Sequence, residues 1–147
     1  MPSISNNNNR PQRQHGDDAG CDLWAAHSVN AWAHWTVTVR TGYCPAPGDI
    51  PPHSVGLVFA RSSLHLKGLS LANGVGVIDS GYRGEVLLAV RNDVNVPVTI
   101  DEGERIAQIV VVPLDMSSAL YAHDANILTD NNKQPRGQGG FGSTGRI

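Results

Sequence analysis

Long apolar runs are absent from this sequence, and their absence excludes whole classes of protein. No stretch of the 147 residues approaches the roughly 20 apolar residues that a membrane span requires. The N-terminal region also lacks the apolar core of a secretory signal peptide. We therefore expect a protein of the cell interior, either cytoplasmic or, for a viral chain, inside the host cell, with no membrane as its partner.

Charge and cysteine are scarce as well. The formal net charge is −2, and the 11 basic residues are spread along the chain. No polybasic surface therefore points to a nucleic-acid polymer as a partner. Cys21 and Cys44 have neither a CxxC spacing nor cysteine or histidine companions at zinc-finger intervals. These features disfavour a disulfide framework and a structural zinc site.

Strand-forming residues dominate what is present. Valine and isoleucine together number 23 against 11 leucines, and β-branched side chains favour strands. Apolar and polar side chains alternate from residue 35 to 40, which is typical of a half-buried strand. The pattern predicts a single all-β domain over residues 1–147, a barrel or a sandwich. Its further strands are expected at 55–60, 85–91, 96–100 and 105–112.

One short helix is expected at 62–67. Ser62 or Ser63 can serve as its N-cap, and Gly68 can end it. Outside the predicted domain core, the polar residues 1–16 should be mobile or loosely docked, and residues 131–147 should form an extended tail.

The tail contains five glycines within residues 136–145. A flexible linker is the plain interpretation. A GxGxxG spacing occurs there, but it neither follows a strand nor opens a helix, which excludes a dinucleotide-binding fold. The alternative is an arm in which Arg136, Ser143, Thr144 and backbone N–H groups wrap phosphates while Phe141 stacks on a base.

Two central segments are further candidates for chemistry. Arg61, Ser62 and Ser63 can face one anion, or they can be an ordinary helix start with a surface arginine. Asp79 follows two apolar residues in a segment, 73–85, that is expected to form a hairpin. It is either a partly shielded carboxylate that deprotonates a water, or a turn aspartate satisfied by backbone N–H groups.

Five segments, taken in chain order, resemble the five motifs of the homotrimeric dUTPase (deoxyuridine 5'-triphosphate nucleotidohydrolase) family. The resemblance covers nearly the whole chain. The segments are AGCDL at 19–23, RSSL at 61–64, GVIDSGYRGE at 76–85, GERIAQ at 103–108 and RGQGGFGSTG at 136–145.

The resemblance implies a distorted jelly-roll protomer with one short helix and a mobile glycine-rich C-terminal arm, 131–147, that closes the active site. It implies a homotrimer whose active sites are shared between chains. It also implies a hydrolase of nucleotide metabolism that converts dUTP to dUMP and pyrophosphate with Mg²⁺, by attack of water on the α-phosphorus. That reaction keeps uracil out of DNA and supplies dUMP for thymidylate synthesis.

The same resemblance assigns roles to residues in the first three motifs. Asp79 would be the base that activates the attacking water, and Asp22 would hold waters of the Mg²⁺ bound by the triphosphate. Asn73 and the backbone near Gly76 would read the uracil edge. Tyr82 would lie beneath the deoxyribose and exclude a ribose 2′-hydroxyl.

The phosphate chain would be held by the remaining motif residues. Ser62, with Ser63 beside it, would contact the region between the α- and β-phosphates, and Arg61 and Gln108 would support the chain. Phe141 would stack over uracil when the arm closes. The other arm residues that would bind substrate are Arg136, Gly142, Ser143 and Thr144.

Two other functions compete with hydrolysis of dUTP. A dCTP deaminase shares the fold, but Ala89 stands where that family's pattern places its catalytic glutamate. A binding protein that uses the scaffold to regulate a protein partner is the other rival. The segment 25–52, which is rich in histidine, proline and tryptophan, is unusual for the family. Its tryptophans and the preceding Trp24 are expected to pack in the core, with a partner-binding patch as the alternative.

Overall fold

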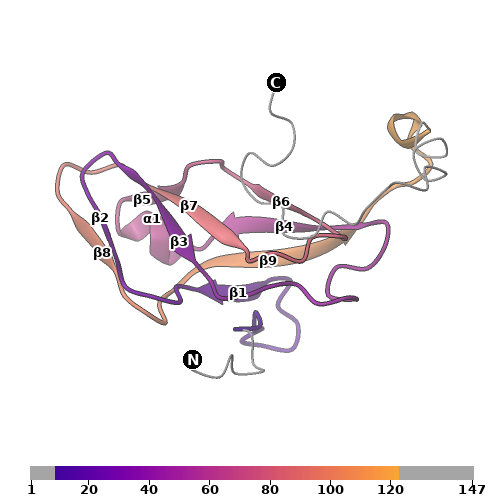
Figure 1. The fold of residues 1–147 in the computed structure, drawn as a ribbon, viewed down its shortest axis with the longest axis horizontal. Helices are drawn as coiled ribbons and strands as arrows, with labels where there is room; N and C mark the ends of the chain where they lie inside the picture. Colours follow the sequence, from indigo (N-terminus) through magenta and orange to yellow (C-terminus); the bar gives the residue numbers. More distant parts are fainter. Residues whose placement is uncertain (1–8, 123–147) are drawn as a thin grey trace.

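The all-β prediction is confirmed. The computed structural model describes residues 9–122, and the strands run antiparallel around one apolar core, with one short α-helix beside them (Figure 1). The elements are β1 (Cys21–Trp24), β2 (Val29–Ala31), β3 (Thr36–Arg40), β4 (Ser54–Ala60), α1 (Ser62–Leu66), β5 (Leu69–Leu71), β6 (Gly76–Asp79), β7 (Leu87–Asn92), β8 (Val98–Ile100), β9 (Arg105–Pro113) and the 3₁₀ helix η1 (Ala119–Tyr121).

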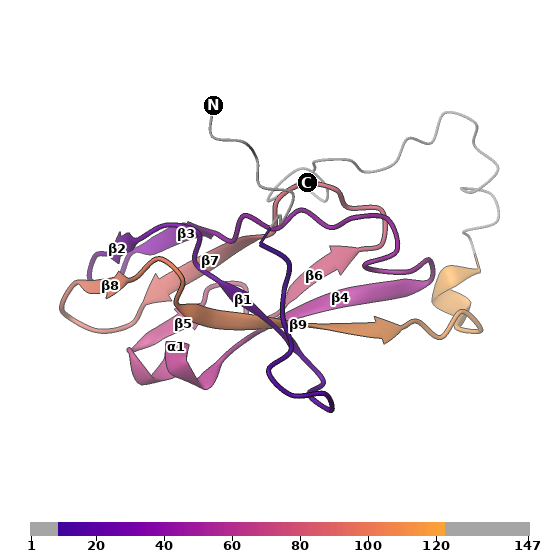
Figure 2. The same ribbon diagram turned by 90° about the horizontal axis from the view of Figure 1, so that it is seen from below.

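Three sheets organise these strands. The largest has the order β1-β9-β4-β6, a second has the order β3-β7-β5, and β2 pairs with β8. Figures 1 and 2 show β4 and β9 as the long central strands, with the β2–β8 pair at one end of the molecule. Within the described residues no helix is long and apolar enough to cross a membrane.

Helix α1 depends on packing rather than on its own propensity. Five residues are too few for a helix to be stable in water, but Leu64 is fully buried and anchors it to the core. Gly68 ends the helix with φ +79°, as expected. The expected serine N-cap is wrong: the cap is Arg61, without a side-chain hydrogen bond. The Ser63 hydroxyl instead donates to the Arg105 carbonyl oxygen at 2.8 Å, which ties the helix to β9.

The expected hairpin over 73–85 is also wrong. Strand β6 pairs with β4, and Asp79 lies opposite Val55. An apolar run shows that a strand is present but not which strand it joins. Strand β6 is consequently an edge of the four-stranded sheet rather than one arm of a local hairpin.

The expectation that the tryptophans pack in the core is only partly met. In the single protomer Trp24 is half-buried, but Trp32 and Trp35 are 51% and 63% exposed. Both flank the tight turn between β2 and β3, where the Trp35 amide donates to the Trp32 carbonyl oxygen. The alternation that places Val39 in the core begins only after this turn.

The described part of the N-terminal segment is docked. Arg10 makes two hydrogen bonds of 2.9 and 2.8 Å to the Asp49 carboxylate. Gln12 and Asp22 exchange two backbone hydrogen bonds, of 3.2 and 2.7 Å. This second contact closes the loop between residues 12 and 22 at its base.

Asn92 is a fully buried polar side chain that fixes one end of the core. Its amide nitrogen donates to the carbonyl oxygens of Ala31 and Val96, at 2.9 and 2.8 Å, and its amide oxygen accepts from the Val94 N–H at 2.9 Å. Both N–H groups of the amide and its oxygen therefore have partners, as burial of an amide requires.

We predict that Asn92→Leu destabilises the protein by roughly 2–4 kcal/mol, because it removes the partner of one buried carbonyl oxygen and of two partly buried backbone groups. Guanidinium unfolding followed by tryptophan fluorescence would measure the loss. The control is Asn30→Leu, since the Asn30 side chain hydrogen-bonds only at the exposed surface. It should cost less than about 0.5 kcal/mol, and equal losses in the two variants would contradict the assignment.

Candidate functional site

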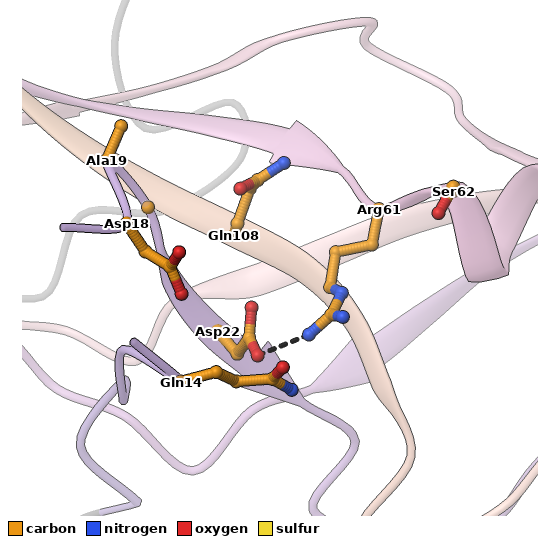
Figure 3. A pocket seen from close by; sticks show the side chains of 8 residues that line it. Gln14, Asp18, Ala19, Asp22, Arg61, Ser62 and Gln108 are labelled. Atoms are coloured by element: carbon orange, nitrogen blue, oxygen red, sulfur yellow. Dashed lines mark ion pairs between the residues drawn. The ribbon is translucent and has the colours of Figure 1, made fainter. Parts of the chain in front are cut away.

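A polar pocket of about 320 Å³ opens between the 14–20 loop, β1, β9 and the start of α1 (Figure 3). It gathers residues from three of the sequence motifs. The lining residues are Gln14, Asp18, Ala19, Gly20, Asp22, Arg61, Ser62 and Gln108.

Strand pairing is what brings these segments together. Gln108 on β9 lies opposite Asp22 on β1 and, on its other side, opposite Phe59 on β4. Strand β4 then leads directly into Arg61, whose backbone N–H donates to the Ile106 carbonyl oxygen at 3.0 Å. Paired strands therefore hold one side of the pocket, with Asp22, Gln108 and Arg61, and the 14–20 loop forms the other side.

Asp22 is the buried carboxylate of this pocket, with only 7% of the residue exposed. Its Oδ2 atom pairs with the guanidinium of Arg61 and lies 3.4 Å from Nη1 of Arg105. Two cations thus offset the cost of burying the charge. The other carboxylate oxygen points toward the side of the pocket occupied by Asp18 and Gln108 (Figure 3).

Gly20 makes room for Gln108. A Cβ atom at position 20 would lie 2.5 Å from Oε1 of Gln108 and 3.2 Å from its Cβ. Any side chain there would push the Gln108 amide out of its place beside Gly20. Gly20 is therefore required for the shape of the pocket.

A second, smaller pocket of about 170 Å³ lies near the start of β6. Its walls are mostly apolar, and Asn73 is its polar side chain. A Cβ atom at Gly76 would lie 3.1 Å from the Val58 Cβ atom and so would narrow this space. The lining residues are Val58, Leu71, Asn73, Gly76, Val77, Ile78, Val86, Leu87 and Leu88.

Tyr82 lies against the core and lines a third, more open concavity, together with Arg40 and Glu85. Its hydroxyl donates to the Glu85 carbonyl oxygen at 2.6 Å, and burial raises the pKa of that hydroxyl. Burial alone would also raise the pKa of the Glu85 carboxyl, but hydrogen bonds from Arg40 and the Gly42 amide hold that pKa below its ordinary value. The tyrosine ring is thus fixed in place, with its hydroxyl already engaged.

Asp79 lines none of these three pockets. The expectation that its carboxylate is shielded from water is wrong for the single protomer, where it is exposed. The reason is that β6 is an edge strand. Asp22 on β1 and Asp79 on β6 are separated by three strand-to-strand steps across the sheet. Along β4, the position level with Asp22 is Phe59 and the position level with Asp79 is Val55, four residues away. At ~4.8 Å per strand and ~3.3 Å per residue, the Cα atoms of Asp22 and Asp79 are about 20 Å apart in the sheet.

The other predicted site residues are divided between the two smaller-volume pockets, the helix contact with β9 and the part of the chain outside the described residues. Arg61, Ser62 and Gln108 line the Asp22 pocket, and Asn73 and Gly76 line the smaller one. Ser63 does not line the Asp22 pocket, because its hydroxyl is bonded to β9. The predicted arm residues Arg136, Phe141, Gly142, Ser143 and Thr144 lie outside the described residues.

Sequence reasoning missed three residues at the Asp22 pocket. They are Gln14 and Asp18, which line it, and Arg105, which pairs with Asp22. Asp18 lies four positions before Asp22 in an irregular loop, where no periodicity marks it. Among residues 9–122, no three His, Cys, Asp or Glu side chains gather closely enough to hold a metal ion by themselves.

Comparison with known proteins connects this geometry to one family. The dUTPase family model matches residues 6–145 of the chain. A deoxyuridine 5'-triphosphate nucleotidohydrolase from Cutibacterium acnes is 40% identical over 147 aligned positions, which span 99% of this chain and 91% of that protein. The enzyme of the same name from Mycolicibacterium gilvum is 39% identical, over 92% of this chain and 86% of that protein.

Solved structures agree with these relatives. The dUTPase from Streptococcus mutans superposes with a TM-score of 0.69 at 30% identity, covering 78% of this chain and 92% of that chain. The dUTPase of Staphylococcus bacteriophage 80alpha superposes with a TM-score of 0.66 at 28% identity, covering 76% and 86%. The chain therefore belongs to the dUTPase family, whose members hydrolyse dUTP to dUMP.

Proposed function

We propose that this protein works in the cell interior as a homotrimer in which each active site combines the Asp22 pocket of one subunit with Asp79 and the Asn73 pocket of another. It releases dUMP and pyrophosphate by attack of water on the α-phosphorus of dUTP. The observation that carries this proposal is the strand order and register, which separate the Cα atoms of Asp22 and Asp79 by about 20 Å.

That separation is too large for one chain to complete the chemistry. A general base must reach the water that it deprotonates at about 3 Å, and a metal held near the phosphates must lie close to the same phosphorus atom. A rigid sheet cannot close such a gap within the protomer. A second subunit can, because β6 is an edge strand and presents Asp79 outward.

The Asp22 pocket suits the phosphate chain and its divalent cation. The family uses a divalent metal ion, and Mg²⁺ prefers oxygen ligands while keeping several of its waters. The inward Asp22 oxygen and the Gln108 amide oxygen are such acceptors, and Arg61 and the Ser62 hydroxyl are donors for phosphate oxygens. When bound, Mg²⁺ would neutralise negative charge on the triphosphate.

Asp79 would accept a proton from the attacking water as the water oxygen bonds to the α-phosphorus. The bond between that phosphorus and the oxygen bridging to the β-phosphate breaks, and pyrophosphate leaves with the electron pair. Arg61 and Ser62 would stabilise the charge that develops on the leaving group. This division of labour suits phosphoryl transfer, which depends mainly on positioning and electrostatic stabilisation.

The Asn73 pocket suits a flat base with polar edges. Its apolar walls can cover the faces of uracil, and the Asn73 amide can pair with the uracil edge. Tyr82, fixed by its hydrogen bond to Glu85, would support the deoxyribose. In the arm, Phe141 would stack over the base, and Arg136, Gly142, Ser143 and Thr144 would enclose the γ-phosphate.

We predict that the protein releases pyrophosphate from dUTP but not from dCTP, dTTP or UTP. Asp79→Asn should lower kcat about 10²–10⁴-fold, since it removes the general base. A coupled pyrophosphate assay measures both effects. Asp115→Asn is the control, because Asp115 is an exposed aspartate whose hydrogen bonds are to neighbouring Ser117. No turnover of dUTP by the folded wild-type trimer would contradict the proposal.

Sharing of the site predicts complementation between two inactive variants. Asp22→Asn and Asp79→Asn should each be inactive alone, yet a mixture refolded together should regain about one quarter of wild-type activity. Three of every four randomly assembled trimers contain both variants, and each of those has one intact site out of three. Sites built within single subunits would regain nothing.

Gly20→Ala should lower kcat/KM for dUTP by roughly 10- to 100-fold, because it displaces the Gln108 amide from the phosphate pocket. The midpoint of thermal unfolding should stay unchanged, since the displaced atom is the end of a flexible side chain. Gly16→Ala is the matched control, as a Cβ atom there meets nothing within 4 Å. Similar activity in both variants would show that the Gln108 position is unimportant.

A further inference from the structure

We infer that Asp18 is a second carboxylate of the metal site and accepts hydrogen bonds from water bound to the divalent cation in the Asp22 pocket. The inference rests on the proposed function, in which that pocket holds the triphosphate and its cation. Asp18 lines the same pocket, and Figure 3 shows its carboxylate turned toward the side that Asp22 faces.

The loop that carries Asp18 is held in place. Its base is closed by the two backbone hydrogen bonds between Gln12 and Asp22. Inside the loop, the Asp18 Oδ2 atom accepts from the His15 N–H at 2.9 Å, and the Asp18 N–H donates to the His15 carbonyl oxygen at 3.2 Å. One carboxylate oxygen therefore orients the side chain, and the other remains to face the pocket.

Charge balance explains why a second carboxylate is needed. Asp22 alone faces two guanidinium groups, those of Arg61 and Arg105, and both contact the same oxygen. Asp22 and the two arginines together carry one net positive charge, which disfavours a cation. Asp18 brings the four groups to neutrality and adds an oxygen acceptor at the pocket.

The chemistry of the cation points the same way. Mg²⁺ holds its octahedral shell tightly and usually keeps several waters, which need acceptors around them. Asp22 offers one oxygen toward the pocket, because arginines occupy the other. Partners in the outer shell of a metal typically change its affinity 10- to 100-fold when they are removed.

The competing explanation is that Asp18 only stabilises its turn. Two substitutions separate the roles. Asp18→Asn keeps an oxygen that can accept from the His15 N–H but removes the charge, whereas Asp18→Ala removes both. Asp17→Asn is the matched control, because Asp17 is an adjacent exposed acid that does not line this pocket.

The test measures Mn²⁺ binding to the trimer in complex with a non-hydrolysable α,β-imido analogue of dUTP, by electron paramagnetic resonance of free Mn²⁺. Asp18→Asn should weaken Mn²⁺ binding about tenfold, while Asp17→Asn should leave it at the wild-type value. Binding of the analogue in the presence of EDTA should not weaken in Asp18→Asn, because the loss concerns the cation and not the nucleotide.

Wild-type Mn²⁺ affinity in Asp18→Asn, with or without a loss in Asp18→Ala, would overturn the inference and leave Asp18 as a turn residue. The proposed function would survive that result if the wild type binds Mn²⁺ with the analogue and hydrolyses dUTP. A wild-type protein that does neither would overturn both.

Discussion

Strand β9 is the element on which the rest of the site depends. It pairs with β1 on one side and β4 on the other, so one strand fixes the relative positions of Asp22 and Arg61. Its backbone also accepts hydrogen bonds from the Arg61 N–H and from the Ser63 hydroxyl. The helix start, the buried carboxylate and Gln108 are therefore set by a single register. A slip of one residue would turn Gln108 to the other face of the sheet.

The electrostatics of Asp22 follow from this arrangement. A carboxylate with 7% exposure needs compensation, and the register supplies it from Arg105 on β9 and Arg61 after β4. The Arg61 guanidinium that pairs with Asp22 is also the group proposed to contact the phosphate chain. Arg105 is the partner that can stay with Asp22 throughout, since its backbone is part of the central strand.

Local patterns in the sequence predicted β3, β4, β7, β8, β9 and the position of α1, because period and glycine placement are local signals. The short strands β1, β2 and β5 were not predicted. Local patterns failed where the answer depended on a distant partner. The Ser63 hydroxyl bonds to β9 rather than to its own helix, and β6 joins β4 instead of forming a hairpin. The pocket residues Asp18 and Arg105 were missed for the same reason, since only the folded sheet brings them to Asp22.

Strand β6 connects assembly to catalysis in the proposed trimer. Among the described residues it is an edge strand, and Val75 just before it and Val77 within it are 43% and 63% exposed. An apolar edge of this kind invites non-specific pairing unless something covers it. A neighbouring subunit that covers it also receives Asp79, the last residue of the strand. The contact that covers the edge is then the contact that completes the active site. A lone protomer would be inactive and prone to non-specific association.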